Sequence, residues 1–393
     1  MNATEKDGKL ILELVGRIDT TNAPVMEQEI QAALDEHPSA VPAFDMEKLE
    51  YISSAGLRVL LKVVRKSREK VEAYEVSQEV YDIFNTTGFT VLMDVRKAFR
   101  RISIDGLKQI GYGTTAAVYR LDPETIVKVY HPEIQLDFIE RENERSRNAF
   151  LNGVPTAIAY DIVKVGDCFG SVYELLDAQD FLEILVNDKE HLEKHIADFA
   201  LKMKEMHRIE VDPEKFVSVK QKSIRGLPML KENGICSQEE VDKMTRLLES
   251  VPDRNTFLHG DNHPGNIMVQ NGEFMFIDLG VSGYGHPILD MMTMCGNYLL
   301  APMAGDNEIK SPISTSFTNE EKLRIWKAYI CTYLGTTDEA FIKKVSTQIA
   351  AISAARILFA TVHIPGLLNE QQVNNLKRTA ISYVDAGMEP ICF

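Results

Sequence analysis

The stretch from Phe257 to Gly280, FLHGDNHPGNIMVQNGEFMFIDLG, constrains this chain more than any other part of its sequence. Asp261 lies five residues before Asn266, and Asp278 ends an apolar run twelve residues further on. Because apolar residues come before and after each polar cluster, we expect these side chains at the ends of neighbouring strands. Two oxygen-bearing side chains placed in this way can share a magnesium ion, while a third acid stays free as a base.

This stretch resembles the catalytic loop and the metal-binding loop of the protein-kinase-like phosphotransferases. Its HGDxHxxN form is similar to that of the aminoglycoside phosphotransferase and choline kinase family. The resemblance implies that Asp261 accepts or orients the proton of an acceptor hydroxyl, and that Asn266 and Asp278 bind magnesium. It also implies that His259 braces the loop and that Asp290, in GHPILDMM, supports it from the following helix.

A glycine-rich hairpin is predicted in LKQIGYGTTAAVYRLDPETIVKVYHP, which begins at Leu107. Gly111 and Gly113 would let backbone amides approach a polyphosphate, and Val118 would cover the adenine of ATP. Taken alone, Gly-x-Gly between two strands more often marks a simple hairpin turn. Lys128, in IVKVY, favours the nucleotide site, because it occupies the place of the kinase lysine that holds the α- and β-phosphates.

In the family this lysine pairs with a glutamate on the following helix, and FIERENERSRNAFLNGVP offers Glu140, Glu142 and Glu144. The spacing to the next strand and the family resemblance both favour Glu142. Glu144 stays open, since two acids two residues apart lie on different helix faces and only one can face the lysine. The resemblance also places Glu174 and Leu176, in YELL, where the chain crosses between two lobes and presents main-chain groups to the adenine.

The first hundred residues alternate between predicted strands and helices, a pattern typical of a compact α/β sandwich. They resemble the STAS domain of anti-sigma-factor antagonists in VGRIDTTNAPVMEQEI, FDMEKLEYISSAGLRVLL and VYDIFNTTGFTVLMDV. The resemblance implies that a partner kinase phosphorylates Ser54 and thereby controls binding to that partner. The family often has an aspartate before this serine, whereas this chain has Ser53, and both serines could instead cap the helix.

A linker is predicted at residues 95–106, which mix charged residues with few apolar anchors. We therefore expect an α/β STAS-like domain at residues 1–103 and an α+β bilobal protein-kinase-like domain at residues 104–393. The N-lobe of the second domain is expected at about residues 104–177 and its C-lobe at about residues 178–393.

The composition favours a cytoplasmic globular protein. The chain has 393 residues, of which 45% are hydrophobic, and a net charge of −15 that disfavours nonspecific attraction to nucleic acid or to an anionic membrane. Its five cysteines show no CxxC or Cys/His spacing, so we predict neither a zinc site nor a disulfide framework. The first residues do not resemble a signal peptide, and no run approaches the ~18 apolar residues of a membrane span.

The region from residue 300 to 393 is predicted to be mainly helical. In the family it builds the acceptor pocket, but nothing in the sequence identifies the acceptor. The segment APMAGDNEIKSPISTSFTNEEK is poor in hydrophobic residues and is expected to be a mobile loop. A helix should follow it, beginning at Thr318 through the capping box TNEE.

Two functions are consistent with these motifs. The first is an ATP- and magnesium-dependent phosphotransferase that acts on a hydroxyl of a small molecule, with the STAS-like domain as a regulatory module that binds a protein partner. The second is a signalling partner-switch protein of the anti-sigma-factor antagonist type. Its kinase-like domain would phosphorylate a STAS serine, in cis on Ser54 or in trans, or would only bind nucleotide.

Overall fold

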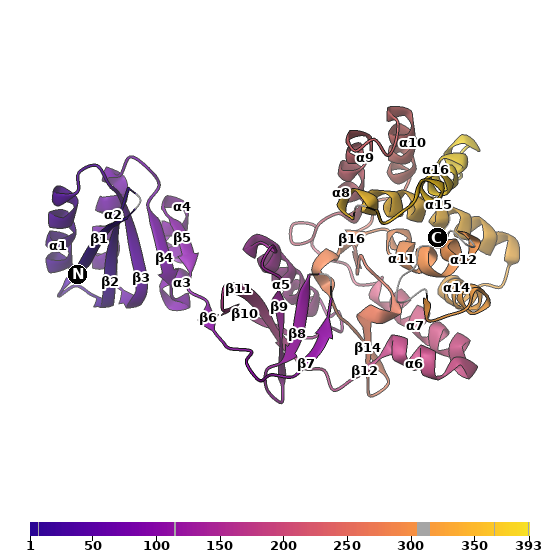
Figure 1. The fold of residues 1–393 in the computed structure, drawn as a ribbon, viewed down its shortest axis with the longest axis horizontal. Coiled ribbons are helices and arrows are strands. Elements are labelled where there is room, and N and C mark those ends of the chain that lie inside the picture. The colour runs from indigo at the N-terminus through magenta and orange to yellow at the C-terminus, as the bar shows by residue number, and fades with distance from the viewer. Residues whose placement is uncertain (7, 114, 305–314, 365, 392) are drawn as a thin grey trace. The chain divides into compact units, whose positions relative to one another are not determined.

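The computed structural model divides the chain into two units, Met1–Ile102 and Ser103–Phe393 (Figure 1). It describes all residues except 7, 114, 305–314, 365 and 392. The central part of the loop expected after residue 300 therefore lies outside the described residues. The fold classes expected for the two domains, α/β and two-lobed α+β, are both found.

The first unit contains a five-stranded sheet in the order β1-β2-β3-β4-β5. Strand β1 is antiparallel to β2, and the remaining neighbours are parallel. Buried side chains alternate along β2, where Leu10, Leu12 and Leu14 are fully buried, as the two-residue period of a strand requires. The strands are β1 (Asn2–Lys6), β2 (Lys9–Ile18), β3 (Val41–Ile52), β4 (Glu72–Val76) and β5 (Asp94–Lys97). The helices are α1 (Ala23–Glu36), α2 (Ser54–Lys66), α3 (Gln78–Thr87) and α4 (Phe89–Leu92).

The two serines at the start of α2 differ in what they do. The Ser53 hydroxyl caps the helix by accepting a hydrogen bond from the N–H of Gly56. Ser54 is the first residue of the helix and is exposed. Gly56 packs so closely that a Cβ there would lie 2.7 Å from side-chain carbons of Ile18 and Ile52. The helix start therefore lies tightly against the sheet, and Ser53 alone supplies the side-chain cap.

The second unit begins with an antiparallel sheet whose strands lie in the order β10-β11-β9-β8-β7. Helix α5 packs against β10 and β11 and reaches the short helix η3. The elements are β7 (Gln109–Tyr112), β8 (Ala116–Arg120), β9 (Thr125–Tyr130), α5 (Leu136–Leu151), β10 (Ala159–Val165), β11 (Cys168–Glu174) and η3 (Leu279–Val281). The short strand β6 (Arg100–Arg101) precedes them in the chain.

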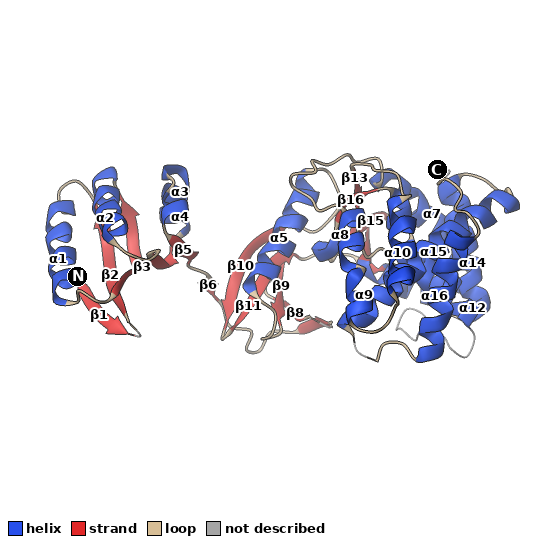
Figure 2. Cartoon of the chain, turned by 90° about the horizontal axis from the view of Figure 1, so that it is seen from above, coloured by secondary structure: helices blue, strands red, loops and turns tan. Residues whose placement is uncertain are grey.

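The rest of the second unit is mostly helical. Figure 2 shows helices α7, α14, α15 and α16 gathered at the end of this unit opposite α5 and its sheet. The helices are α6 (Phe181–Asn187), η1 (Lys189–His191), α7 (Leu192–Met206), α8 (Val219–Gly226), α9 (Pro228–Glu232), α10 (Gln238–Glu249), η2 (Pro264–Asn266), η4 (Pro287–Leu289), α11 (Met292–Cys295), the π-helical η5 (Gly296–Leu300), α12 (Ala301–Ala304), α14 (Asn319–Leu334), α15 (Glu339–His363) and α16 (Glu370–Asp385). Thr318 begins α14 through the predicted capping box with Glu321.

Short strands carry the loops of the candidate site within this helical part. Strand β12 (Gln179–Asp180) pairs with β14 (Ile267–Gln270), which pairs with β15 (Glu273–Phe276). Strand β13 (Thr256–Leu258) pairs with β16 (Gly283–Gly285). The loop from residue 259 to 263 leaves β13, and the loop from residue 277 to 278 leaves β15. Asn266 directly precedes β14 and Asp278 follows the neighbouring strand β15, so these two side chains lie at the ends of neighbouring strands as expected, whereas Asp261 follows β13 of a different sheet.

Helix α15 corrects one expectation from the sequence. At 25 residues, with a mean hydropathy of 1.5 over its most apolar window, it is long and apolar enough to cross a membrane. From the sequence we predict no apolar run of the length of a membrane span. However, 56% of that window is buried inside the unit, where α15 packs against α11, α14 and α16. A buried core helix passes the same test of length and composition, so α15 is weak evidence for a membrane span.

A substitution in the core of the first unit should destabilise that unit and leave the second unit unchanged. Phe84 in α3 is fully buried, with its ring centroid 5.6 Å from that of Phe89. Phe84→Ala should lower the free energy of unfolding of this unit by about 3–5 kcal/mol, because it leaves a cavity. The single tryptophan, Trp326, lies in the other unit, so its fluorescence reports on that unit. We expect the circular-dichroism transition of the first unit to shift while the fluorescence transition stays in place.

The control is Val91→Ala, because Val91 is 78% exposed and should change stability by no more than about 0.5 kcal/mol. A Phe84→Ala protein whose circular-dichroism transitions match those of the wild type would contradict this description of the core.

Candidate active site

The loop that follows β13 is held by a buried carboxylate. Asp290 is fully buried, and its two oxygens accept hydrogen bonds from the backbone N–H groups of His259, at 2.9 Å, and Gly260, at 2.7 Å. His207 Nε2 lies 3.1 Å from the same carboxylate, and Tyr333 hydroxyl lies 2.7 Å from His207 Nδ1. Burial alone would raise the pKa of Asp290, but the bond to His207 and these N–H groups lower it below its usual range. Asp290 is therefore ionised and fixes the start of the loop.

His259 joins this loop to the loop after β15. Its ring is buried, and burial lowers its pKa, so the imidazole is neutral. Nδ1 accepts a hydrogen bond from the N–H of Asp261, which puts the ring proton on Nε2, where it is donated to the carbonyl of Ile277 at 3.1 Å. Gly260 has a φ of +83°, and a Cβ there would overlap the carbonyl oxygen of Val281. A side chain at Gly260 would therefore separate the two loops.

Asp261 presents a partly exposed carboxylate between the side chains of His263 and Arg356. Its oxygens lie 3.6 Å from His263 Nε2 and 3.6 Å from an Arg356 nitrogen, and the Thr293 hydroxyl donates to it at 3.4 Å. Burial would raise the pKa of Asp261, but His263 and Arg356 hold it well below its usual range. The carboxylate is therefore ionised at neutral pH and can accept a proton or a hydrogen bond.

Asn266 and Asp278 present oxygen atoms of the kind that magnesium prefers. Asn266 Nδ2 donates to the carbonyl of Asp261 at 2.9 Å, which leaves Oδ1 for another partner. Asp278 has φ 59° and ψ 58°, a left-handed conformation uncommon for a residue with a side chain, and that side chain is 54% exposed. No described part of the chain gathers three or more His, Cys, Asp or Glu side chains that could hold a metal. A magnesium ion here would need water and phosphate oxygens as its other ligands, as is usual for this ion.

Lys128 connects the sheet to both acids that the sequence singled out. Its Nζ lies 2.5 Å from Glu142 and 3.0 Å from Asp278. Burial alone would lower the pKa of Lys128, but the carboxylates of Asp278 and Glu142 raise it, so the amine is charged. A Cβ at Gly280 would come within 2.9 Å of Glu142, so a glycine there permits the close approach of α5. Of the glutamates left open by the sequence, Glu142 is the one that contacts Lys128, while Glu144 is exposed.

The glycine-rich hairpin forms one row with Lys128 across the sheet. Gly111 in β7 is opposite Val118 in β8, and Val118 is opposite Lys128 in β9. Directly paired residues share a face of a sheet, so all three lie on the same face. The N–H of Gly113 donates to the carbonyl of Ala116 at 2.8 Å and closes the turn.

The proposed adenine-contacting segment lies at the end of β11. Glu174 is the last residue of that strand, and its carboxylate accepts a hydrogen bond from the N–H of Ile158 at 3.1 Å. Leu176 follows in the segment that leads toward β12 and is half-buried. This segment is where the chain passes from the sheet to the helical part, as expected for the crossing between two lobes.

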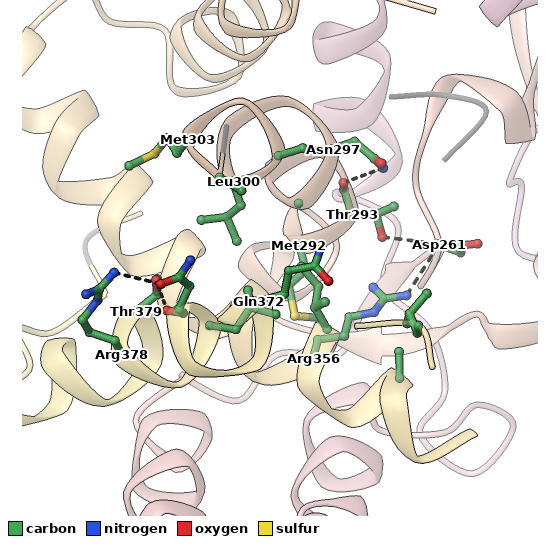
Figure 3. A pocket seen from close by; sticks show the side chains of 18 residues that line it. Asp261, Met292, Thr293, Asn297, Leu300, Met303, Arg356, Gln372, Arg378 and Thr379 are labelled. Carbon is green, nitrogen blue, oxygen red and sulfur yellow. Dashed lines mark hydrogen bonds and ion pairs between the residues drawn. The ribbon is translucent and has the colours of Figure 1, made fainter. Parts of the chain in front are cut away.

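A cavity of about 390 Å³ opens beside Asp261 (Figure 3). This size falls in the range of small-molecule sites. Its walls come from the segment α11–η5–α12, from α15 and from α16. Figure 3 shows Asp261, Thr293 and Arg356 together at one end and Arg378 at the opposite end, with Leu300 and Met303 above the space between them. The cavity can therefore hold a small molecule with one end at the Asp261 carboxylate.

The structure brings Lys128 of β9, Glu142 of α5, and Asp261, Asn266 and Asp278 together in one unit, whereas Ser54 belongs to the other unit. Sequence reasoning missed Arg356 and Thr293, which both contact Asp261. A charged residue inside the apolar stretch ISAARILFATVHIP was a signal that could have indicated Arg356. Thr293 had no such signal, because only the fold brings it to the loop.

Comparison with known families divides the chain in the same place. Residues 106–309 match the model of the phosphotransferase enzyme family, and residues 1–102 match that of the STAS domain. A curated relative, the putative anti-sigma factor antagonist BtrV of Bordetella bronchiseptica, is 36% identical over 92 residues. These residues are 23% of this chain and 78% of that protein.

The solved structures that match parts of this chain include the following two. A choline/ethanolamine kinase family protein from Mesorhizobium loti is 14% identical, with a TM-score of 0.46 over 71% of this chain and 87% of its own. The ADP-bound aminoglycoside phosphotransferase APH(2'')-Ib is 16% identical, with a TM-score of 0.45 over 77% of this chain and 98% of its own.

The buried carboxylate that holds the loop predicts a pH-dependent loss of stability. Asp290→Asn removes a charge that three hydrogen-bond donors share, so it should lower the free energy of unfolding by roughly 1–3 kcal/mol at neutral pH. The depressed pKa of Asp290 adds stability above the pKa of the unfolded state, near 4, and this stability is lost as the pH falls through the folded pKa. Unfolding can be followed by Trp326 fluorescence. The difference in free energy of unfolding between the wild type and Asp290→Asn should therefore shrink below about pH 4.

Asp198→Asn is the matched control, because Asp198 lies exposed on α7 in the same unit. It should leave the transition within about 0.5 kcal/mol of wild type. An Asp290→Asn protein as stable as this control would contradict the anchoring role of Asp290.

Proposed function

Because the chain belongs to the phosphotransferase enzyme family and carries an N-terminal STAS domain, we propose that it transfers the γ-phosphoryl group of ATP to a hydroxyl of a small molecule. The observation that carries this proposal is the linkage of Lys128 to both Glu142 and Asp278. A charged lysine held by a helix glutamate and close to the metal-binding acid is the arrangement that an active kinase needs.

The residues divide the work of phosphoryl transfer among them. Lys128 would bind the α- and β-phosphates, with the backbone around Gly111 and Gly113 against the phosphates and Val118 against the adenine. Glu174 and Leu176 would present main-chain groups to the base. Asn266 and Asp278 would hold magnesium, which supplies positive charge against the phosphate oxygens when bound.

Asp261 would act on the acceptor. Its ionised carboxylate faces the cavity, so a hydroxyl bound there can donate its hydrogen bond to it and direct an oxygen lone pair toward the phosphorus. The hydroxyl proton passes to Asp261 as the new P–O bond forms and the bond to ADP breaks. A carboxylate with a depressed pKa is a weak base, so its main contribution is to orient the hydroxyl.

Replacement of the Asp261 carboxylate should slow phosphoryl transfer without weakening the binding of ATP. Asp261→Asn should lower kcat for acceptor phosphorylation by about a hundred- to ten-thousand-fold, because a neutral amide orients the hydroxyl less strongly than a carboxylate and cannot accept its proton. The dissociation constant for ATP should change little, since Asp261 is not among the residues proposed to bind the nucleotide. Coupled ADP release across a panel of hydroxyl compounds, with calorimetric ATP titration, measures both quantities. The Asp198→Asn control should behave as wild type, and full activity in Asp261→Asn would exclude its proposed role.

A second candidate function follows from the first unit. Ser54 is exposed at the first position of α2, while Ser53 performs the capping, so the Ser54 hydroxyl is free for modification without loss of the helix cap. A phosphate there would meet the unpaired N–H groups of the helix start. In this alternative the chain is a partner-switch protein whose kinase-like domain acts on a STAS serine in cis or in trans, or only binds nucleotide.

Mass spectrometry distinguishes the two functions. If the domain acts in cis, incubation of the intact chain with magnesium and ATP should add one phosphoryl group to Ser54. The Ser54→Ala and Asp261→Asn variants should both stay unmodified, while Ser53→Ala should still accept the group. A wild-type chain that stays unmodified while it phosphorylates a small hydroxyl compound would favour the first function and count against the cis version of the second.

A further inference from the structure

The cavity beside Asp261 is poorly suited to a cationic acceptor. Of its described lining residues, Asp261 is the only one with a carboxylate. That carboxylate is already close to His263 and Arg356. None of the described lining residues is aromatic, whereas quaternary ammonium groups are typically held by aromatic side chains. An amine-rich or choline-like acceptor would therefore find no second counter-charge and no aromatic surface along this lining.

Positive charge lies at both ends of the same cavity. At the transfer end, Arg356 donates to the carbonyl of Gly260 at 2.6 Å, and its side chain is 32% exposed. Burial lowers the pKa of Lys222, and the charges of Arg145 and Arg356 lower it further, so these three basic side chains lie near one another. At the other end, Arg378 lies exposed on α16 and donates to Asn375 at 3.0 Å (Figure 3).

The wall between the two ends is largely apolar. Met292, Leu300, Met303, Ile357 and Leu376 line it. The polar groups that join them are amides and hydroxyls, including Gln372 and Thr379, which carry no net charge. A guanidinium at the end of an apolar channel binds a carboxylate or a phosphate through charge-assisted hydrogen bonds. The lining of the cavity is thus complementary to a molecule with a hydroxyl at one end, an apolar body and an anionic group at the other end.

We propose that the phosphate acceptor is an anionic hydroxyl compound, whose carboxylate or phosphate binds Arg378 while its hydroxyl lies at Asp261. This inference rests on the proposed phosphotransfer function and gives its acceptor a chemical class. It also means that the net charge of −15 does not describe the cavity, because Asp261 is the one carboxylate among its described lining residues.

Three matched series of linear alcohols test this acceptor class with the intact chain. Each has four to eight carbons and a terminal hydroxyl, and the other terminus carries a carboxylate, a carboxamide or an amine, as in 6-hydroxyhexanoate, 6-hydroxyhexanamide and 6-aminohexanol. Ligand-observed NMR gives the dissociation constants, and phosphorus NMR with magnesium and ATP follows transfer in parallel. The best hydroxy acid should bind about ten- to a hundred-fold more tightly than its amine counterpart, as expected for a charge-assisted hydrogen bond.

Charge reversal at the distal end should reverse the preference. Arg378→Glu should weaken binding of the hydroxy acid by at least about tenfold and strengthen that of the amine, while the carboxamide changes least. Because Arg378 is exposed, the variant should fold as wild type. Arg246→Glu, an exposed charge reversal on α10 outside the lining, is the matched control and should leave all three dissociation constants unchanged.

The outcomes are distinct. Preference for the hydroxy acid that inverts in Arg378→Glu supports the proposal. Equal or tighter binding of the amine, indifference to Arg378→Glu, or no binding of any member would overturn it. Binding of the hydroxy acid without transfer to any compound would support the charge preference and contradict the proposed phosphotransfer function.

Discussion

The buried carboxylate of Asp290 is the interaction on which the candidate site depends. An isolated buried charge is costly, and this one is stabilised because two backbone N–H groups and His207 donate to it at once. Tyr333 in α14 completes the cluster through its hydrogen bond to His207, the residue that follows α7. The position of the Asp261 loop is therefore tied to the core packing of two long helices. The His259 ring then donates a hydrogen bond to the carbonyl of Ile277, which precedes Asp278, so the second loop is held in place as well.

Two kinds of chemistry meet at Asp261. On one side Lys128 contacts both Glu142 and Asp278, and Asn266 donates to the Asp261 carbonyl, so this is the side that we propose binds the phosphates of ATP. The cavity on the other side is built by helices from the C-terminal part of the chain, with Arg356 beside Asp261 at one end and Arg378 at the other. The net charge of the whole chain, −15, is therefore a poor guide to the charge of this cavity.

The sequence predicted the loops better than the pocket, for a physical reason. Asp261, Asn266 and Asp278 lie within one short segment whose strand and turn pattern is local. The preference for Glu142 followed from its spacing to the next strand together with the family resemblance, while Glu144 stayed open. Both fold classes followed from alternating elements and motif order. Arg356 and Thr293 reach Asp261 from distant segments, so only the packing of α11 and α15 reveals them. The apolar length of α15 was also underestimated, because its polar residues are dispersed along the helix.

The most direct test of this account is a calorimetric titration of the intact chain with ATP, with magnesium and again with a chelator. If the Asp290 cluster holds Asn266 and Asp278 in place for a metal-bound nucleotide, ATP should bind more tightly with magnesium. Asp278→Ala should lose that gain and bind ATP equally in both conditions. Equal affinity of the wild-type chain with and without magnesium, or no binding of ATP at all, would contradict the account.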